Sequence, residues 1–160
     1  MEEWEAKKIL KSITNAISYL HCKQITHRDI KLDNIMIDSN LDSKLIDFGF
    51  SICSGSNQKL KLFCGTPSYM SPEIASRREY LGPPTDIWSL GVLLYAMICG
   101  SFPFKGLTES ELYKKIIAGS LNIPSSVSEN AKTLIKKMLS SDPSKRPSAN
   151  EVINKIGFEW

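Results

Sequence analysis

The chain has 160 residues, of which 42% are hydrophobic and 23% are charged. This composition is typical of one folded domain, and it excludes disorder, a collagen repeat and a long coiled coil. The 20 basic and 17 acidic residues give a net charge of +3, which is too small to indicate binding to nucleic acid or membrane. We therefore expect neither as a partner.

The first expected element is a helix over residues 1–20, where apolar residues recur at helical spacing. Two short apolar stretches, residues 34–37 and 44–46, flank the turn-forming residues 38–40 and predict a small β-hairpin. Residues 49–72 show no periodicity and are rich in Gly, Ser and Pro. A loop of this length in a compact domain is usually functional or disordered.

Four helices are expected in the second half of the chain. Residues 86–99 are apolar almost all round, as in a helix buried at the centre of a domain, and the run is shorter than the ~20 residues that a membrane span needs. The other three helices are amphipathic and cover residues 109–118, 128–139 and 148–156. Ser148 and Glu151 have the spacing of a capping box. The predicted fold class is mainly α with a small β-hairpin.

The four cysteines are dispersed, and the only histidines are His21 and His27, so no zinc-binding spacing is present. The adjacent His21 and Cys22 could be a pair of metal ligands or the end of an ordinary helix, and we favour the helix end. Dispersed cysteines without a signal peptide indicate a reducing compartment. We expect a cytoplasmic protein, and a nuclear location is also open.

Residues 27–34 read His-Arg-Asp-Ile-Lys-Leu-Asp-Asn and place three kinds of polar group in one short loop. The carboxylate of Asp29 can act as a general base toward a hydroxyl group. The ammonium of Lys31 can neutralise charge on a transferred phosphoryl group, and the amide oxygen of Asn34 can bind Mg²⁺. Asp47, in an Asp-Phe-Gly sequence, follows 13 residues after Asn34. If the two apolar stretches pair, both residues lie at the open end of the hairpin and suit Mg²⁺.

These motifs resemble the catalytic loop and the metal-binding loop of protein kinases. A third kinase motif, Ala-Pro-Glu, is matched by Ser71-Pro72-Glu73. The three motifs occur in the order and at the spacing of that family, so the chain is identified as a member of the eukaryotic-type serine/threonine protein kinases. The resemblance implies that residues 1–160 are the C-terminal lobe of a kinase domain, with residues 49–72 as its activation loop and the β-rich N-terminal lobe missing.

The resemblance also implies roles for individual residues, with ATP and Mg²⁺ as cofactors and protein Ser or Thr hydroxyls as acceptors. Asp29 is expected to be the catalytic base, and Lys31 is expected to contact the γ-phosphate. Thr66 is expected to form hydrogen bonds with Asp29 and Lys31. Asn34 and Asp47 are expected to bind Mg²⁺. The residues expected around the nucleotide are Lys31, Asp33, Asn34, Met36 and Asp47. Met36 matches an apolar floor beneath adenine, and a core position within the hairpin is a compatible alternative.

Further matches are structural. His27 and Phe48 match residues whose packing aligns the metal-binding loop. Asp86 matches an aspartate that holds the backbone of the catalytic loop, and a buried carboxylate needs such hydrogen-bond partners. Arg146 matches an arginine that pairs with Glu73 and ties the end of the activation loop to the helical body.

Two features indicate the kinase class. Lys31 and Thr66 are typical of serine/threonine kinases, and the sequences around Asp-Phe-Gly and Phe-Cys-Gly most resemble the calmodulin-dependent and AMP-activated group. Phe50 favours serine as acceptor, with simple filling of the core as its alternative. The resemblance also implies an apolar pocket for the substrate residue after the acceptor, lined by Phe63, Pro67 and Met70.

The chain departs from the family pattern in its activation loop. Leu62 stands where similar kinases carry a phosphorylated threonine, so we expect Arg28 to have no phosphate partner there and the loop to be ordered by other contacts. Three serines of the loop could be phosphorylated instead, or could be unmodified loop residues: Ser51, Ser54 and Ser56.

A second departure is that the Gly-rich loop and the Val-Ala-Ile-Lys strand of kinases are absent from the 160 residues. Two hypotheses follow. In the first, the chain is the catalytic lobe of a kinase that is active within a longer parent chain and inactive without its N-terminal lobe. In the second, the chain is a catalytically silent module that docks substrates or regulators.

Overall fold

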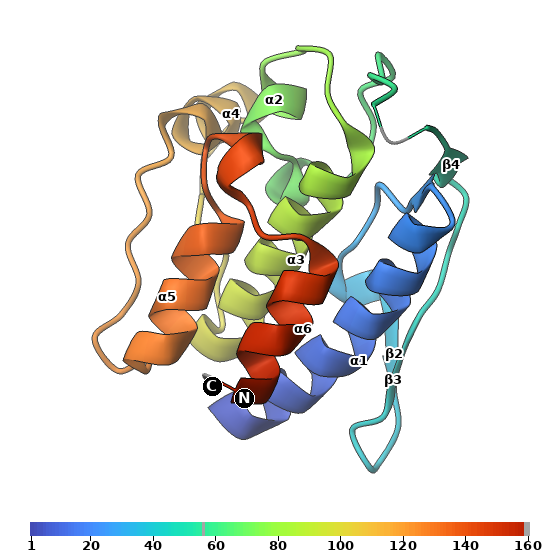
Figure 1. Cartoon of the computed structure of the whole chain (residues 1–160). Helices are drawn as coiled ribbons and strands as arrows, with labels where there is room; N and C mark the ends of the chain where they lie inside the picture. Colours follow the sequence, from blue (N-terminus) through green and yellow to red (C-terminus); the bar gives the residue numbers. More distant parts are fainter. Residues whose placement is uncertain (56, 159–160) are drawn as a thin grey trace.

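The computed structural model describes residues 1–55 and 57–158. Helices make up most of it, as Figure 1 shows. The longer helices are α1 (Glu3–Cys22), α3 (Gly82–Cys99), α4 (Glu109–Ala118), α5 (Glu129–Met138) and α6 (Ala149–Phe158). The shorter ones are α2 (Pro72–Ala75) and three 3₁₀ turns, η1 (Leu32–Asn34), η2 (Pro67–Tyr69) and η3 (Pro143–Lys145).

The expected hairpin is present and consists of β2 (Ile35–Ile37) and β3 (Ser43–Leu45), which pair antiparallel with Ile35 opposite Leu45. A second sheet, between β1 (Ile25–Thr26) and β4 (Ile52–Cys53), was not expected. Strands of two residues are too short to show the alternation by which a strand is recognised in a sequence. The predicted fold class, mainly α with a small β-hairpin, is confirmed.

The helices largely follow the predicted boundaries, with one difference at the start of α3. That helix begins at Gly82, four residues before the expected Asp86, and its first turn contains Pro83 and Pro84. Proline is tolerated in a first helical turn because the amides there have no partner within the helix. The capping box of α6 is present, since the Ser148 amide donates to Glu151 Oε2 at 2.7 Å and the Glu151 amide donates to Ser148 Oγ at 3.3 Å.

The helices are arranged around α3, which contacts α1 on one side and α5 on the other (Figure 1). Helix α6 packs along α1, and α2 contacts α4. The β2–β3 hairpin lies against α1 at the edge of the molecule. Within the described ranges, no helix has both the length and the apolar character needed to cross a bilayer.

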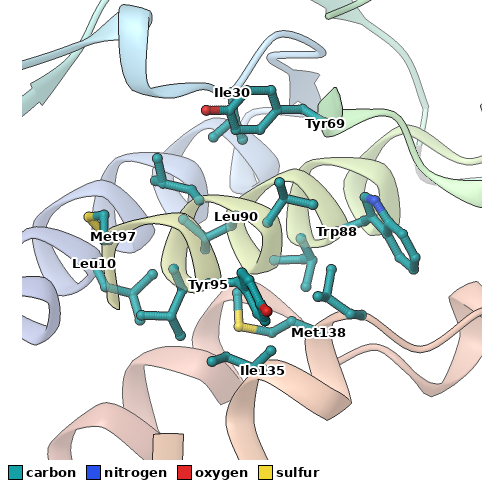
Figure 2. Packing of buried hydrophobic residues seen from close by; sticks show 14 of the residues in the cluster. Leu10, Ile30, Tyr69, Trp88, Leu90, Tyr95, Met97, Ile135 and Met138 are labelled. Atoms are coloured by element: carbon teal, nitrogen blue, oxygen red, sulfur yellow. The ribbon is translucent and has the colours of Figure 1, made fainter. Parts of the chain in front are cut away.

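The core forms where α1, α3 and α5 meet, and it extends to the catalytic loop. Figure 2 shows Leu90 and Trp88 of α3 with Ile135 of α5 on one side and Ile30 and Tyr69 on the other. Ile30 follows Asp29 directly and is fully buried. Burial of a side chain of this size contributes about 1.5–3 kcal/mol, so the core itself anchors the loop that carries the polar motif.

Candidate active site

The carboxylate of Asp86 holds the start of the catalytic loop. It is 1% exposed, and it accepts hydrogen bonds from the backbone amides of His27 at 3.0 Å and Arg28 at 2.9 Å. The ring of His21 adds a third contact at 2.9 Å. Arg28 adopts the left-handed region, with φ of 67°, which costs a non-glycine residue roughly 1–2 kcal/mol. The bonds to Asp86 therefore stabilise a backbone conformation that the loop alone does not favour.

His27 connects the catalytic loop to the Asp-Phe-Gly segment. Its Nε2 lies 3.2 Å from the Ile46 carbonyl oxygen, and its Nδ1 accepts a hydrogen bond from the Asp29 amide at 3.3 Å. A tautomer with the proton on Nε2 satisfies both contacts. The ring also meets Phe48 edge to face, with centroids 5.1 Å apart. His27 and Phe48 are thus in contact, as the resemblance implied.

Asp29 is the centre of a cluster of polar side chains. Thr66 donates its hydroxyl to Asp29 Oδ1 at 2.9 Å, and Lys31 Nζ lies 2.8 Å from Asp29 Oδ2 and 3.1 Å from Thr66 Oγ1. Asn34 donates its amide to both the backbone oxygen and Oδ2 of Asp29, at 2.8 and 3.1 Å. The structure brings together four of the residues that the sequence singled out, and it places them on two segments.

Gly65 makes this approach of Thr66 possible. Its φ is 117°, and a Cβ at this position would lie 3.0 Å from the Arg28 carbonyl oxygen. Only glycine adopts such a conformation without strain and also leaves room for the neighbouring backbone. The activation loop therefore passes close enough to the catalytic loop for Thr66 to reach Asp29.

The cluster also controls the charge of its members. Burial acts to raise the pKa of the Asp29 carboxyl, but hydrogen bonds from Lys31 and Thr66 outweigh it and hold this pKa below its usual value. The hydrogen bond with Asp29 raises the pKa of Lys31 above its usual value. At neutral pH the pair is therefore an ionised carboxylate and an ammonium.

This charge pattern predicts a measurable titration. The pKa of Asp29 is lower in the folded state than in the unfolded state, so its ionic contacts stabilise the fold fully at pH values above the unfolded-state pKa. This stabilisation is lost as the pH falls through the folded-state pKa of Asp29. We expect Lys31→Met to raise the pKa of Asp29, because burial then acts with less opposition. Carboxyl-carbon NMR titration in Mg²⁺-free buffer measures this shift. Lys44→Met, which removes an exposed lysine of β3, is the matched control, and an equal shift in both variants would contradict the prediction.

Asn34 and Asp47 lie at the same open end of the hairpin, as the sequence predicts. The Ile35–Leu45 pairing and a hydrogen bond from the Ile46 amide to the Asn34 carbonyl, at 2.9 Å, set this position. Asp47 adopts a left-handed backbone with φ of 62°, and its Oδ1 accepts the Gly49 amide at 3.0 Å.

The donor atoms at this end fit Mg²⁺. The contacts of Asn34 with Asp29 use its amide nitrogen, so its side-chain oxygen is available as a metal ligand. The exposed Asp47 carboxylate supplies further oxygens. A site with one or two protein oxygen ligands, completed by phosphate and water, is the usual arrangement for Mg²⁺. Asp33, in η1, is exposed beside Lys31, and its charge helps to raise the pKa of that lysine.

Three apolar side chains of β2 and of the segment after β3 are exposed. Met36, Phe48 and Phe50 have exposed fractions of 60%, 51% and 45%. The interpretation of Met36 as a core residue of the hairpin is therefore wrong, because β2 presents it to solvent. Simple filling of the core does not account for Phe50 either.

Two of the three expected substrate-pocket residues share one cavity. Phe63 and Met70 both line a cavity of about 490 Å³ between the activation loop, α2 and α4. Pro67 is not part of that lining and instead begins η2, directly after Thr66. Pro67, the third expected residue, thus belongs to the turn that follows Thr66 and not to the wall of the cavity.

The activation loop is held by contacts with Tyr80. Leu60 and Tyr80 exchange backbone hydrogen bonds at 2.8 and 3.2 Å, and the Tyr80 hydroxyl donates to the Leu62 carbonyl at 2.7 Å. Leu60, Ile74 and Tyr80 form a small buried cluster. These contacts order the loop without a phosphate at position 62.

The guanidinium of Arg28 is only partly paired within the described residues. Its Nε donates to the Phe50 carbonyl at 2.6 Å, and its buried Nη1 has no hydrogen-bond partner within the described residues. Ser51 makes a long contact with the His27 carbonyl, at 3.5 Å, and Ser54 is buried, which hinders its modification in this conformation. Ser56 lies outside the described residues.

Glu73 and Arg146 form the expected bidentate pair. The two guanidinium nitrogens donate to the two carboxylate oxygens at 2.7 and 2.8 Å. Arg146 also donates to the Ser140 and Pro84 carbonyls and lies over the Trp88 ring, 5.0 Å from its centroid. The end of the activation loop is thereby tied to α3 and to the segment before α6.

Sequence reasoning missed His21, Tyr80 and Tyr69 as parts of the site. His21 contacts Asp86, Tyr80 holds the activation loop, and the Tyr69 hydroxyl accepts the Leu32 amide at 3.2 Å. No local pattern relates these residues to partners that are 18 to 65 positions away. The interpretation of His21 and Cys22 as the end of a helix is confirmed, since α1 ends at Cys22.

Comparison with known proteins agrees with this geometry. The protein kinase domain family matches residues 1–156. The chain is 44% identical over 154 residues to the Probable serine/threonine-protein kinase MARK-A of Dictyostelium discoideum, covering 96% of this chain and 14% of that protein. It is 42% identical over 152 residues to the Serine/threonine-protein kinase SIK3 homolog of Danio rerio, covering 95% of this chain and 13% of that protein. It is 43% identical over 146 residues to the Serine/threonine-protein kinase SIK1 of Rattus norvegicus, covering 91% of this chain and 19% of that protein.

The chain therefore belongs to the protein kinase domain family. The relatives are named serine/threonine-protein kinases, and the similarity to kinases named MARK and SIK confirms the expected resemblance to the AMP-activated group. The chain spans less than a fifth of the length of these relatives.

Proposed function

We propose that this chain is the catalytic lobe of a kinase that transfers the γ-phosphate of ATP to Ser or Thr hydroxyls of a protein substrate. The observation that carries the proposal is the cluster in which Lys31, Thr66 and Asn34 all contact the carboxylate of Asp29. Such a cluster fixes one carboxylate in its ionised form and in one orientation, which is what a general base requires.

In the proposed reaction, the substrate hydroxyl lies beside Asp29, and its oxygen forms a bond to the γ-phosphorus. The bond from that phosphorus to the β–γ bridging oxygen breaks, ADP leaves, and the hydroxyl proton passes to Asp29. Lys31, whose Nζ contacts Asp29 Oδ2, would neutralise charge on the transferred group. Mg²⁺, held by Asn34 and Asp47, would neutralise charge on the β- and γ-phosphates.

We propose further that residues 1–160 are the C-terminal lobe of this kinase and that transfer needs a β-rich lobe from a longer parent chain. Two observations support this. The relatives are several times longer than the chain, and the apolar side chains of Met36, Phe48 and Phe50 are each exposed. Kinase catalysis depends on positioning ATP between two surfaces, and these residues supply one of them.

For location, we propose the cytoplasm, with the nucleus as the alternative. The four cysteines, all within the described residues, are free, which is consistent with a reducing compartment.

The test is transfer of radiolabelled phosphate from ATP to a protein substrate by the purified chain and by a longer form that includes the β-rich lobe. We expect transfer by the longer form, and a reduction of about 10²–10⁴-fold in Asp29→Asn, the usual contribution of a general base. Asp42→Asn, an equal change of charge at an exposed position, is the control and is expected to leave transfer unchanged.

The outcomes separate the two hypotheses. Equal transfer by Asp29→Asn and the unmodified protein would show that Asp29 is not the base. Absence of transfer by both lengths, together with no detectable binding of ATP and Mg²⁺, would instead support a silent docking module for substrates or regulators.

A further inference from the structure

A cavity of about 490 Å³ lies where the end of α1, the start of α3 and the segment from η3 to α6 meet. It is called here the α1–α3–α6 cavity, and none of the residues proposed to act on ATP or on the acceptor lines it. Two hydrogen bonds hold the three elements together. The Ser18 hydroxyl donates to Asn150 Oδ1 at 2.6 Å, and Arg146 donates to the Pro84 carbonyl at 2.9 Å. The cavity is therefore built between helices and does not depend on a long loop.

The apolar wall of this cavity consists largely of proline rings. Pro83 and Pro84 come from the first turn of α3, and Pro143 and Pro147 come from the segment between α5 and α6. Because a proline ring has a fixed backbone φ, little conformational freedom is lost when a ligand packs against it. The face of an aromatic ring is electron-rich and attracts the C–H groups of such a wall. The wall therefore favours a flat aromatic ligand.

The charged groups of the lining are already paired. Arg146 forms the bidentate pair with Glu73, and Glu151 Oε2 accepts two hydrogen bonds from the N-cap residue of α6, at 2.7 and 2.8 Å. With one cation and one anion, the lining has no net charge. Just outside it, Lys145 and Asp142 also balance each other. A neutral ligand is therefore favoured over an ion.

His21 supplies a polar group that a ligand can use. Its Nε2 lies 2.9 Å from Asp86 Oδ2, and this carboxylate already accepts two backbone amides, so Nε2 carries the proton and donates it. In the neutral ring Nδ1 is then an acceptor, and it has no hydrogen-bond partner within the described residues. The side chain is 13% exposed and lines the cavity. A ligand that donates an N–H or O–H group therefore suits this position.

His21 also connects the cavity to the catalytic loop. Asp86, its partner, holds the backbone amides of His27 and Arg28. Hydrogen bonds in a chain polarise one another, so a donor on Nδ1 strengthens the bond from Nε2 to Asp86. Occupation of the cavity is thereby linked to the conformation of the loop that carries Asp29.

We propose that the α1–α3–α6 cavity binds a small neutral aromatic molecule that carries an N–H or O–H group, such as an indole or a phenol. Donation of this group to His21 Nδ1 stabilises the catalytic loop through Asp86. The volume and the combination of an apolar wall with a few polar groups are those of a small-molecule site. The site lies outside the proposed active site, so its occupation does not depend on the function proposed above.

The probes are indole and 1-methylindole, which share an aromatic ring system but of which only indole has an N–H donor. Amide resonances of the 160-residue chain, followed by NMR at about pH 8, where an ordinary histidine is neutral, give both dissociation constants. We expect 1-methylindole to bind roughly 3- to 10-fold more weakly, the usual net contribution of one hydrogen bond. Saturation with indole is expected to shift the amide resonances of His27 and Arg28 and to slow their exchange with solvent.

Three variants localise the effect. Cys22→Trp places a large ring at an exposed lining residue and is expected to abolish binding of both probes. Cys53→Trp makes the same change at an exposed position outside the lining and is expected to leave both dissociation constants unchanged. His21→Phe keeps an aromatic ring without Nδ1, so the two probes should bind equally. The comparison of the two probes on the unmodified protein tests the inference even if His21→Phe does not fold.

The inference would be overturned by absence of saturable indole binding, by equal affinities of the two probes for the unmodified protein, or by binding that Cys22→Trp does not affect. Binding that shifts the amides of Ser18 and Asn150 but leaves those of His27 and Arg28 unchanged would also contradict it, because the connection to the catalytic loop would then be absent. None of these readouts uses phosphate transfer, so failure of this inference and failure of the proposed function are distinguishable.

Discussion

Arg146→Met is expected to lower the free energy of unfolding by about 3–5 kcal/mol, the usual cost of removing one partner of a buried ion pair. The Arg146 side chain is fully buried and Glu73 is 10% exposed, so the carboxylate would remain without its partner. The carbonyl oxygens of Ser140 and Pro84 would lose a donor as well. For a domain of this size, the loss corresponds to a fall in melting temperature of roughly 6–20 °C. Urea and thermal unfolding followed by circular dichroism measure both quantities.

Two controls make this prediction specific. Lys145→Met removes the neighbouring cation, which is 75% exposed, and we expect a change below about 0.5 kcal/mol. The double variant Arg146→Met with Glu73→Leu removes both charges, and it should cost less than the sum of the single changes because no buried charge is left alone. Additive effects would show that Arg146 stabilises through packing on Trp88 and not through the pair.

Asp86→Ala is expected to lower the free energy of unfolding by about 2–6 kcal/mol. One buried and one part-buried backbone amide would lose their acceptor, and an unpaired buried group costs about 1–3 kcal/mol. The amides of His27 and Arg28 should exchange with solvent faster than the stability change alone explains, because the left-handed conformation of Arg28 loses its support. Hydrogen exchange followed by NMR gives this residue by residue.

The matched control for this variant is Asp42→Ala. Asp42 is 70% exposed and meets Lys8 at 3.5 Å across the surface, a contact worth at most about 1 kcal/mol. If Asp86→Ala destabilises the protein no more than Asp42→Ala, the carboxylate of Asp86 does not hold the catalytic loop in solution.

Local patterns predicted the elements of this fold with two kinds of error. The amphipathic helices and the hairpin follow from periodicity, which reports which face of an element is buried. The β1–β4 sheet and the first turn of α3 were missed, because two-residue strands have no period and prolines in a first turn resemble a break. The alternative of Met36 as a core residue was wrong for a related reason, since a three-residue strand does not reveal which of its faces meets the core.

The candidate site was predicted unevenly. Asp29, Lys31 and Asn34 lie within six residues, so their proximity follows from the sequence itself. Asp47 required the hairpin to pair in one register, and Thr66 required the activation loop to fold back over the catalytic loop. The contacts of Thr66, Asp86 and Arg146 were expected only because the motifs resemble those of kinases.

The sequence by itself determined the chemical groups of this protein, namely a carboxylate, an ammonium and two magnesium-type oxygen donors at short spacing, and it determined the family. Only the tertiary structure decided which of these groups meet, how Tyr80 orders a loop that lacks the usual threonine, and that His21 connects a cavity lined by prolines to Asp86. The physical reason is the distance along the chain between the residues that interact. Periodicity and motifs encode contacts between near neighbours, whereas the site depends on packing and hydrogen bonds between segments that are far apart in the chain.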